Sequence, residues 1–130
     1  MIGNIIPVAK ANTIKEGIII SPANSFVIPS SKSLYSFSTV VMLSDVQPNK
    51  NGHEFKITMT NPNRDKTTLV FKANVPDKNF VFGTGKTNSF TILMTNLNIN
   101  GTGVYTFNTT VDDQTLNSFE AKFEVKAEDE

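Results

Sequence analysis

Hydrophobic and polar residues alternate along most of this chain with a period of two, the pattern of a β-strand that has one buried face. The pattern is clearest near the C-terminus, where a short turn separates two such segments. The predicted inward faces of these two segments are Tyr105, Phe107, Thr109 and Val111, and Ala121, Phe123 and Val125. Glu and Lys occupy the positions between the residues of the second set. This region therefore predicts a β-hairpin whose inner face belongs to a core.

The same period, punctuated by clusters of Gly, Pro and Asn, predicts about eight strands in all. The segments before the C-terminal hairpin are residues 13–20, 25–28, 34–44, 53–60, 67–75 and 89–97. Residues 34–44 are apolar on both faces, which indicates a central strand. Within residues 67–75, the predicted inward positions are Leu69, Phe71, Ala73 and Val75. An alternative near the N-terminus is a single helical turn over residues 9–16.

Short strands with no alternating helices favour two antiparallel sheets packed face to face. We expect one domain over residues 1–130, in which residues 1–12 form an irregular arm and residues 127–130 form a frayed acidic tail. The predicted core consists of large apolar residues from most of the strands: Phe37 or Tyr35, Phe55, Ile57, Leu69, Phe71, Ile92, Tyr105, Phe107 and Phe123.

One short motif resembles a known structural feature. Gly103-Val-Tyr105 is similar to the tyrosine corner of immunoglobulin-like domains, in which the phenol bonds to nearby backbone. Together with Gly52-His53 and Asn61-Pro62, it makes residues 34–125 resemble a group of small bacterial sandwich proteins with no established activity. The resemblance implies an immunoglobulin-like antiparallel β-sandwich of seven to nine strands.

Composition narrows the function classes. The chain has no Cys, which excludes disulfides, thiolate metal sites and cysteine nucleophiles. Lys plus Arg and Asp plus Glu are 12 each, so no basic surplus points to nucleic acid as the main ligand. The N-terminus lacks the basic and apolar regions of a signal peptide, and no segment has the length of a membrane span. We therefore expect a soluble, cytoplasmic protein.

The motif Gly83-Thr-Gly-Lys-Thr87 contains the Gly-Lys-Thr of a phosphate-binding loop. That loop needs a Gly at the position of Phe80, a strand before it and a helix after it, whereas a strand is predicted to follow here. We interpret the motif as a flexible hairpin tip whose amides could hold an anion only weakly, and we expect no nucleotide cofactor.

The candidate catalytic and metal-binding residues are few. His53 is the sole histidine, and we expect it at the surface or in a turn because no acidic cluster surrounds it in the sequence. Asp112 and Asp113 fall in a turn, a favoured place for Asp, and the alternative is a calcium site or an acid and base pair. The sequence thus predicts no catalytic residue, no metal site and no enzyme.

The best functional lead is the connection over residues 76–88, which is longer than its flanking strands need. We expect Phe80, Phe82 and Lys86 to form an exposed adhesive tip, the alternative being that the two aromatic rings pack onto the core. The expected function is a non-enzymatic module that binds a protein partner through loops or an exposed strand edge, without nucleic acid or membrane.

Two alternatives stay open at this point. The preference for Lys over Arg, with many Asn and Ile, is typical of AT-rich bacterial or phage genomes, so the chain could be a phage-encoded inhibitor of a host protein or a virion component. A small-molecule or carbohydrate-binding sandwich is the other alternative. The absence of Trp and the assignment of Tyr35 and Tyr105 to strands weigh against it.

Overall fold

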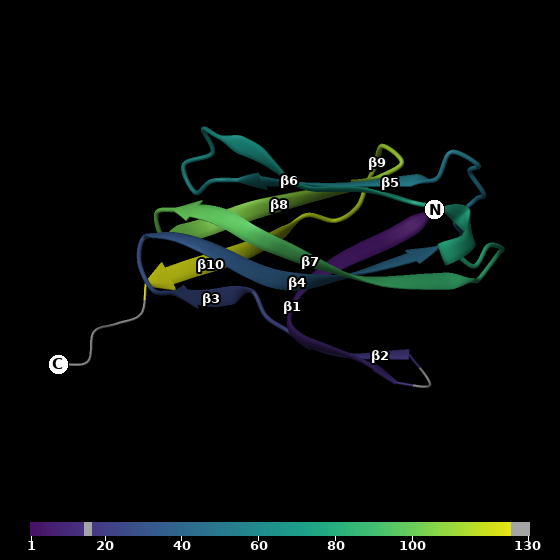
Figure 1. Cartoon of the computed structure of the whole chain (residues 1–130), viewed down its shortest axis with the longest axis horizontal. Coiled ribbons are helices and arrows are strands. Elements are labelled where there is room, and N and C mark those ends of the chain that lie inside the picture. Colours follow the sequence, from purple (N-terminus) through teal and green to yellow (C-terminus); the bar gives the residue numbers. More distant parts are fainter. Residues whose placement is uncertain (15–16, 126–130) are drawn as a thin grey trace.

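Two β-sheets packed face to face make up the body of the protein in a computed structural model (Figure 1). The structure describes residues 1–14 and 17–125, and it describes the backbone alone at residues 10–14, 17–19 and 21. Within these residues there are ten strands and one 3-10 turn: β1 (Ile2–Ile14), β2 (Gly17–Pro22), β3 (Ser25–Ile28), β4 (Lys32–Ser44), β5 (His53–Thr60), β6 (Thr67–Val75), η1 (Asp77–Asn79), β7 (Thr87–Asn100), β8 (Gly103–Val111), β9 (Gln114–Thr115) and β10 (Phe119–Val125).

The first sheet, here called the β4 sheet, has the strand order β2-β1-β4-β7. The second, the β8 sheet, has the order β3-β10-β8-β5-β6, and the two-residue β9 also pairs with β8. Neighbouring strands are antiparallel except for β3, which runs parallel to β10. The predicted all-β sandwich is therefore confirmed. The described residues hold ten strands, where seven to nine were expected.

The N-terminal segment differs from the prediction. Residues 2–14 form one strand, so neither the irregular arm over residues 1–12 nor the helical turn is correct. The first half of β1 pairs with β4, and Asn117 bonds both backbone groups of Ile5. After a register shift at Val8, the second half leaves this pairing and forms a ribbon with β2. The strand predicted over residues 13–20 thus spans the end of β1 and most of β2, while residues 127–130 lie outside the described residues.

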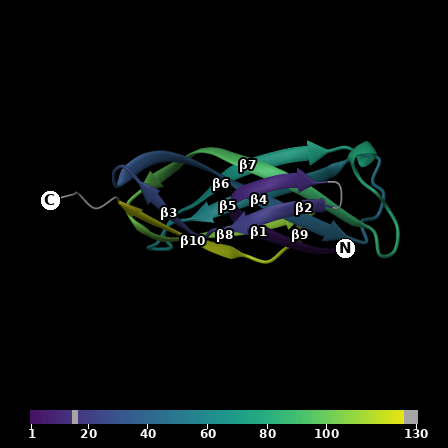
Figure 2. The same ribbon diagram turned by 90° about the horizontal axis from the view of Figure 1, so that it is seen from below.

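The β1–β2 ribbon crosses the outer face of the β4 sheet (Figures 1 and 2). Val8 and Val40 lie on that outer face, yet each is only 1% exposed. Their burial explains why the sequence of β4 is apolar on both sides, because one side faces the core and the other lies beneath the ribbon. β4 is a central strand between β1 and β7, as its pattern predicted.

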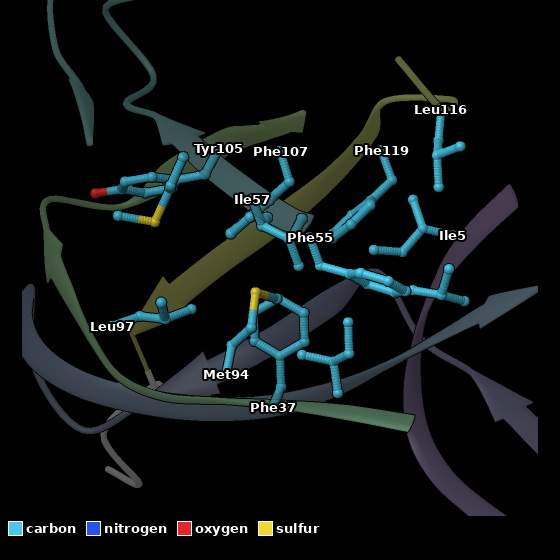
Figure 3. Close-up of a cluster of buried hydrophobic side chains, with 14 of the residues drawn as sticks. Ile5, Phe37, Phe55, Ile57, Met94, Leu97, Tyr105, Phe107, Leu116 and Phe119 are labelled. Atoms are coloured by element: carbon cyan, nitrogen blue, oxygen red, sulfur yellow. The ribbon is translucent and has the colours of Figure 1, made fainter. Parts of the chain in front are cut away.

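The main core lies between the inner faces of the two sheets, where large side chains from both sheets point toward one another (Figure 3). Most of the predicted core residues are buried there: Phe37, Phe55, Ile57, Ile92, Tyr105, Phe107 and Phe123. Leu69 is not, since 53% of it is exposed. The register of β6 against β5 shifts between Phe71 and Leu69, which makes Val70 an extra residue. This bulge breaks the two-residue period and turns Leu69 outward.

Tyr105 has the environment that the tyrosine corner predicted. It is 1% exposed, and its hydroxyl donates a hydrogen bond of 2.7 Å to the carbonyl oxygen of Gly101. Gly103 begins the same strand at φ 131°, and a Cβ atom there would lie 3.0 Å from the ring of Pro62. The absence of a side chain at Gly103 thus lets the turn before β6 pack against β8.

Replacing Tyr105 with Phe removes the buried hydroxyl but keeps the ring. We expect Tyr105→Phe to lower the free energy of unfolding by about 0.5–1.5 kcal/mol, the net value of one hydrogen bond. Tyr35→Phe is the matched control, because the Tyr35 hydroxyl has no hydrogen-bond partner among the described residues. Urea unfolding measures the free energy of unfolding of both variants. If Tyr105→Phe is as stable as Tyr35→Phe, the Tyr105 hydroxyl has no structural role.

Candidate functional site

Three connections meet at the end of the sandwich that lies on the right in Figure 1. They are the loop over residues 45–52, the connection over residues 76–86 that includes η1, and the turn between β8 and β9. His53, the first residue of β5, lies where the three meet and is 1% exposed. The sequence-based expectation of a surface histidine is therefore wrong. His53 does begin a strand after the Asn51-Gly52 turn, as predicted.

Both ring nitrogens of His53 face carboxylates. Nδ1 lies 2.7 Å from an oxygen of Asp112, and Nε2 lies 2.7 Å from an oxygen of Asp77. An ionised carboxylate only accepts hydrogen bonds, and only the protonated imidazolium carries a proton on each nitrogen, so protonation of His53 lets both contacts be hydrogen bonds. In that state the ring is a buried cation held between two anions.

The two carboxylates are themselves anchored by backbone. Asp77 accepts hydrogen bonds of 3.0 and 3.1 Å from the amide of Asn49. This contact lowers the pKa of the Asp77 carboxyl, and the hydrogen bond with His53 lowers it further. Asp112 accepts a bond of 2.9 Å from the amide of Glu54 and donates its own amide to the Glu54 carbonyl. Each of the three connections therefore has a fixed attachment to the histidine centre, which we define as His53, Asp77 and Asp112.

Opposing effects set the pKa of His53. Burial is the largest single effect and lowers the pKa, because it disfavours the charged ring. The hydrogen bonds to Asp112 and Asp77, with the negative charges of both carboxylates, act in the other direction and outweigh it. The net result is a pKa raised above the ordinary value of 6.5.

The aromatic residues predicted to form an exposed tip cover this centre instead. The ring centroid of Phe80 is 4.4 Å from that of His53, and Phe80 is 8% exposed, so the expectation of an exposed side chain is wrong for this residue. Phe82 is half-buried and stacks on Phe80 at a centroid distance of 6.2 Å. A ring near an imidazolium is favoured by cation–π attraction. Lys86 alone of the three predicted residues is exposed, and a role in binding stays a prediction.

The Gly-Lys-Thr motif lies in a loop that is tied to the β4 sheet. The amide of Gly85 donates a hydrogen bond of 2.7 Å to the carboxylate of Asp45, and the amide of Asp45 donates to the carbonyl of Lys86. Strand β7 begins at Thr87, in the place where a phosphate-binding loop would continue as a helix. A carboxylate of the chain itself thus occupies an amide that an anion would need.

The histidine centre leaves little room for metal or acid–base chemistry. Both nitrogens of His53 and both oxygens of each carboxylate are already paired, and a general base needs a nitrogen that is free to take a proton. Asp112 and Asp113 form the predicted turn, with φ angles of 51° and 65°. In the part of the chain that the structure describes, no group of three or more His, Asp or Glu side chains is arranged to hold a metal ion.

No signal in the sequence could have joined these three residues. Asp77 and Asp112 lie 24 and 59 positions from His53, in separate connections. Only the arrangement of the strands brings them together.

Comparison with protein-family models and with curated protein sequences gives no match for this chain. Among the described residues, no helix is long and apolar enough to cross a membrane.

A second candidate surface lies along the side of the sandwich, where edge strands β6 and β7 from the two sheets run past each other. Strand β7 has 14 residues without a single charged residue or proline. Leu93 on β7 and Leu69 on β6 are 57% and 53% exposed. An apolar cavity of about 220 Å³ opens between the two strands. It is lined mainly by Phe55, Phe71, Ala73, Val75, Phe90 and Ile92.

The raised pKa of His53 predicts a pH-dependent stability. A group whose pKa is higher in the folded state contributes its full stability below the unfolded value of 6.5 and loses it as the pH rises through the folded pKa. We therefore expect the free energy of unfolding to fall as the pH is raised above 6.5 and through the folded-state pKa of His53. Because His53 is the sole histidine, its NMR titration reports the same group directly. A midpoint below 6.5 would contradict the geometry.

The burial of Phe80 predicts a different result from that of an exposed tip. We expect Phe80→Ala to destabilise the protein by about 3–5 kcal/mol, the usual cost of emptying a buried aromatic site. The neighbouring Val81 is 57% exposed, and Val81→Ala should change stability by less than about 0.5 kcal/mol. Urea unfolding measures both variants, and an unchanged Phe80→Ala protein would place the ring at the surface.

Proposed function

We propose that this chain is a non-enzymatic protein-binding module of the immunoglobulin-like kind, and that it binds through the exposed edge of β7. The observation that carries the proposal is the composition of that edge. Among the described residues β7 pairs only with β4, so one side of its backbone has no strand partner. Such an edge is a template on which another strand can form main-chain hydrogen bonds.

The other sheet edges have features that hinder strand addition. Strand β6 carries Lys72 and the bulge at Val70. Strand β3 is four residues long and is followed by Pro29, and β2 ends at Pro22. Lysine, proline, bulges and short length are the common means by which natural sheets protect their edges. Strand β7 also has a bulge, at Asn96 (φ 53°). Residues 87–94 before it pair with β4 without interruption and carry neither charge nor proline, so this part of β7 is the least protected edge of the described strands.

The order of the strands supports the immunoglobulin-like part of the proposal. The strand with the tyrosine corner, β8, is central in its sheet and lies between β10 and β5. The short β3 pairs in parallel with the last strand, while β1, from the same N-terminal region, pairs with β4 in the opposite sheet. Sharing of the N-terminal region between both sheets, with an antiparallel remainder, fits an immunoglobulin-like sandwich in which β7 is an edge.

A charge on the edge tests this function. The purified protein serves as bait in an extract of the source cells, beside Leu93→Lys on β7 and the control Val27→Lys on β3, where Val27 is 59% exposed. We expect a partner that the unmodified protein and Val27→Lys retain, and that Leu93→Lys binds at least about tenfold more weakly, or about 1.4 kcal/mol. Equal melting temperatures show that the variants are folded. Retention of the same proteins by Leu93→Lys would contradict the proposal.

A further inference from the structure

We propose that the strand that pairs with the β7 edge is β7 of a second copy of this chain, in antiparallel orientation about a two-fold axis at Leu93. This inference rests on the proposed function, because it names the partner of the same edge. The two β4 sheets would then join side by side into one continuous sheet.

The first argument is charge. When a strand pairs with its own copy across a two-fold axis, a charged side chain at or next to the axis lies close to its own copy, and like charges opposite each other are destabilising. The 14 residues of β7 contain no charge, so self-pairing meets no repulsion at any position of the strand. The other long edge, β6, carries Lys72 next to the middle of the strand, so an axis at its centre would bring two lysines close together.

The second argument is the fit of side chains at the axis. Residues directly opposite in an antiparallel pair point to the same face. An axis at Leu93 places Leu93 against its own copy, and it places Thr91 opposite Thr95 of the other chain. Leu93 is 57% exposed, so its contact removes a large apolar side chain from water. Pairs of threonines across strands add a further stabilising contact.

The third argument is the cavity beside the edge. The apolar cavity of about 220 Å³ between β6 and β7 is lined by Phe71, Phe90 and Ile92, among others. Pairing at β7 brings the same side of the second copy against this opening. The two cavities then face each other, and the apolar surface around both is withdrawn from water. A charged or strongly polar strand would gain nothing from that lining.

The absence of cysteine makes the symmetry directly testable. An axis at Leu93 brings the two copies of a cysteine at this position to a Cα separation of about 4.5–5.5 Å, within the range of a disulfide. We expect Leu93→Cys to form a covalent dimer under mild oxidation. Val27→Cys on β3, equally exposed in the monomer, should remain largely monomeric.

Sedimentation of the reduced proteins provides a second measurement. We expect the unmodified protein and Val27→Lys to be dimers and Leu93→Lys to be a monomer with an unchanged circular dichroism spectrum. A monomeric unmodified protein, with no faster cross-linking of Leu93→Cys than of Val27→Cys, would overturn the inference. If the unmodified protein is a monomer but Leu93→Lys abolishes capture of a different protein, the proposed function stands with another protein at the β7 edge. If the unmodified protein is a monomer and Leu93→Lys abolishes no capture, both the proposed function and the self-pairing are wrong.

Discussion

An open β-sheet necessarily ends in strands whose outer backbone groups have no partner within the sheet. This constraint shapes most of the molecule, because a sandwich of two sheets has four such edges. Three of them have features that hinder pairing: the bulge and Lys72 of β6, the short β3 with its proline, and β2 with Pro22 at its end. Strand β7 is longer than any of these and carries neither charge nor proline, and its bulge at Asn96 lies beyond the regular stretch over residues 87–94. This difference is the reason why we propose the β7 edge as the binding surface.

The histidine centre is governed by a different physical requirement. A charge that is withdrawn from water is costly unless it is paired and hydrogen-bonded. His53 meets this requirement at both nitrogens, and each of its partners is anchored by a backbone amide. The result joins three connections at one end of the sandwich through a single ring, with Phe80 packed over it. The end of the fold that the sequence suggested as a flexible tip is therefore held together by specific side-chain and backbone contacts.

In the connection over residues 76–86, the sequence predicted the local structure correctly but not the contacts that the loop makes. Gly83 and Gly85 have positive φ angles, as expected of a loop before a strand. The loop is nevertheless bound to Asp45 rather than free, and the neighbouring Phe80 fills space in the core. The connection between β6 and β7 is longer than is needed to join the two strands, and this length did indicate a segment with a specific role. Its additional residues, Phe80 and Phe82 among them, cover the histidine centre.

The sequence by itself determined what depends on near neighbours in the chain. Alternation over a few residues establishes a strand and its inner face, which gave the all-β class and most of the core, and the spacing from Gly101 to Tyr105 is short enough to define the tyrosine corner. Only the tertiary structure decided what depends on pairing between distant segments. The bulge that exposes Leu69 is a property of β6 against β5, and the charge of His53 depends on Asp77 and Asp112. Strand order alone makes β7 an edge, since an uncharged alternating strand has the same sequence pattern whether one side or both sides of its backbone are paired.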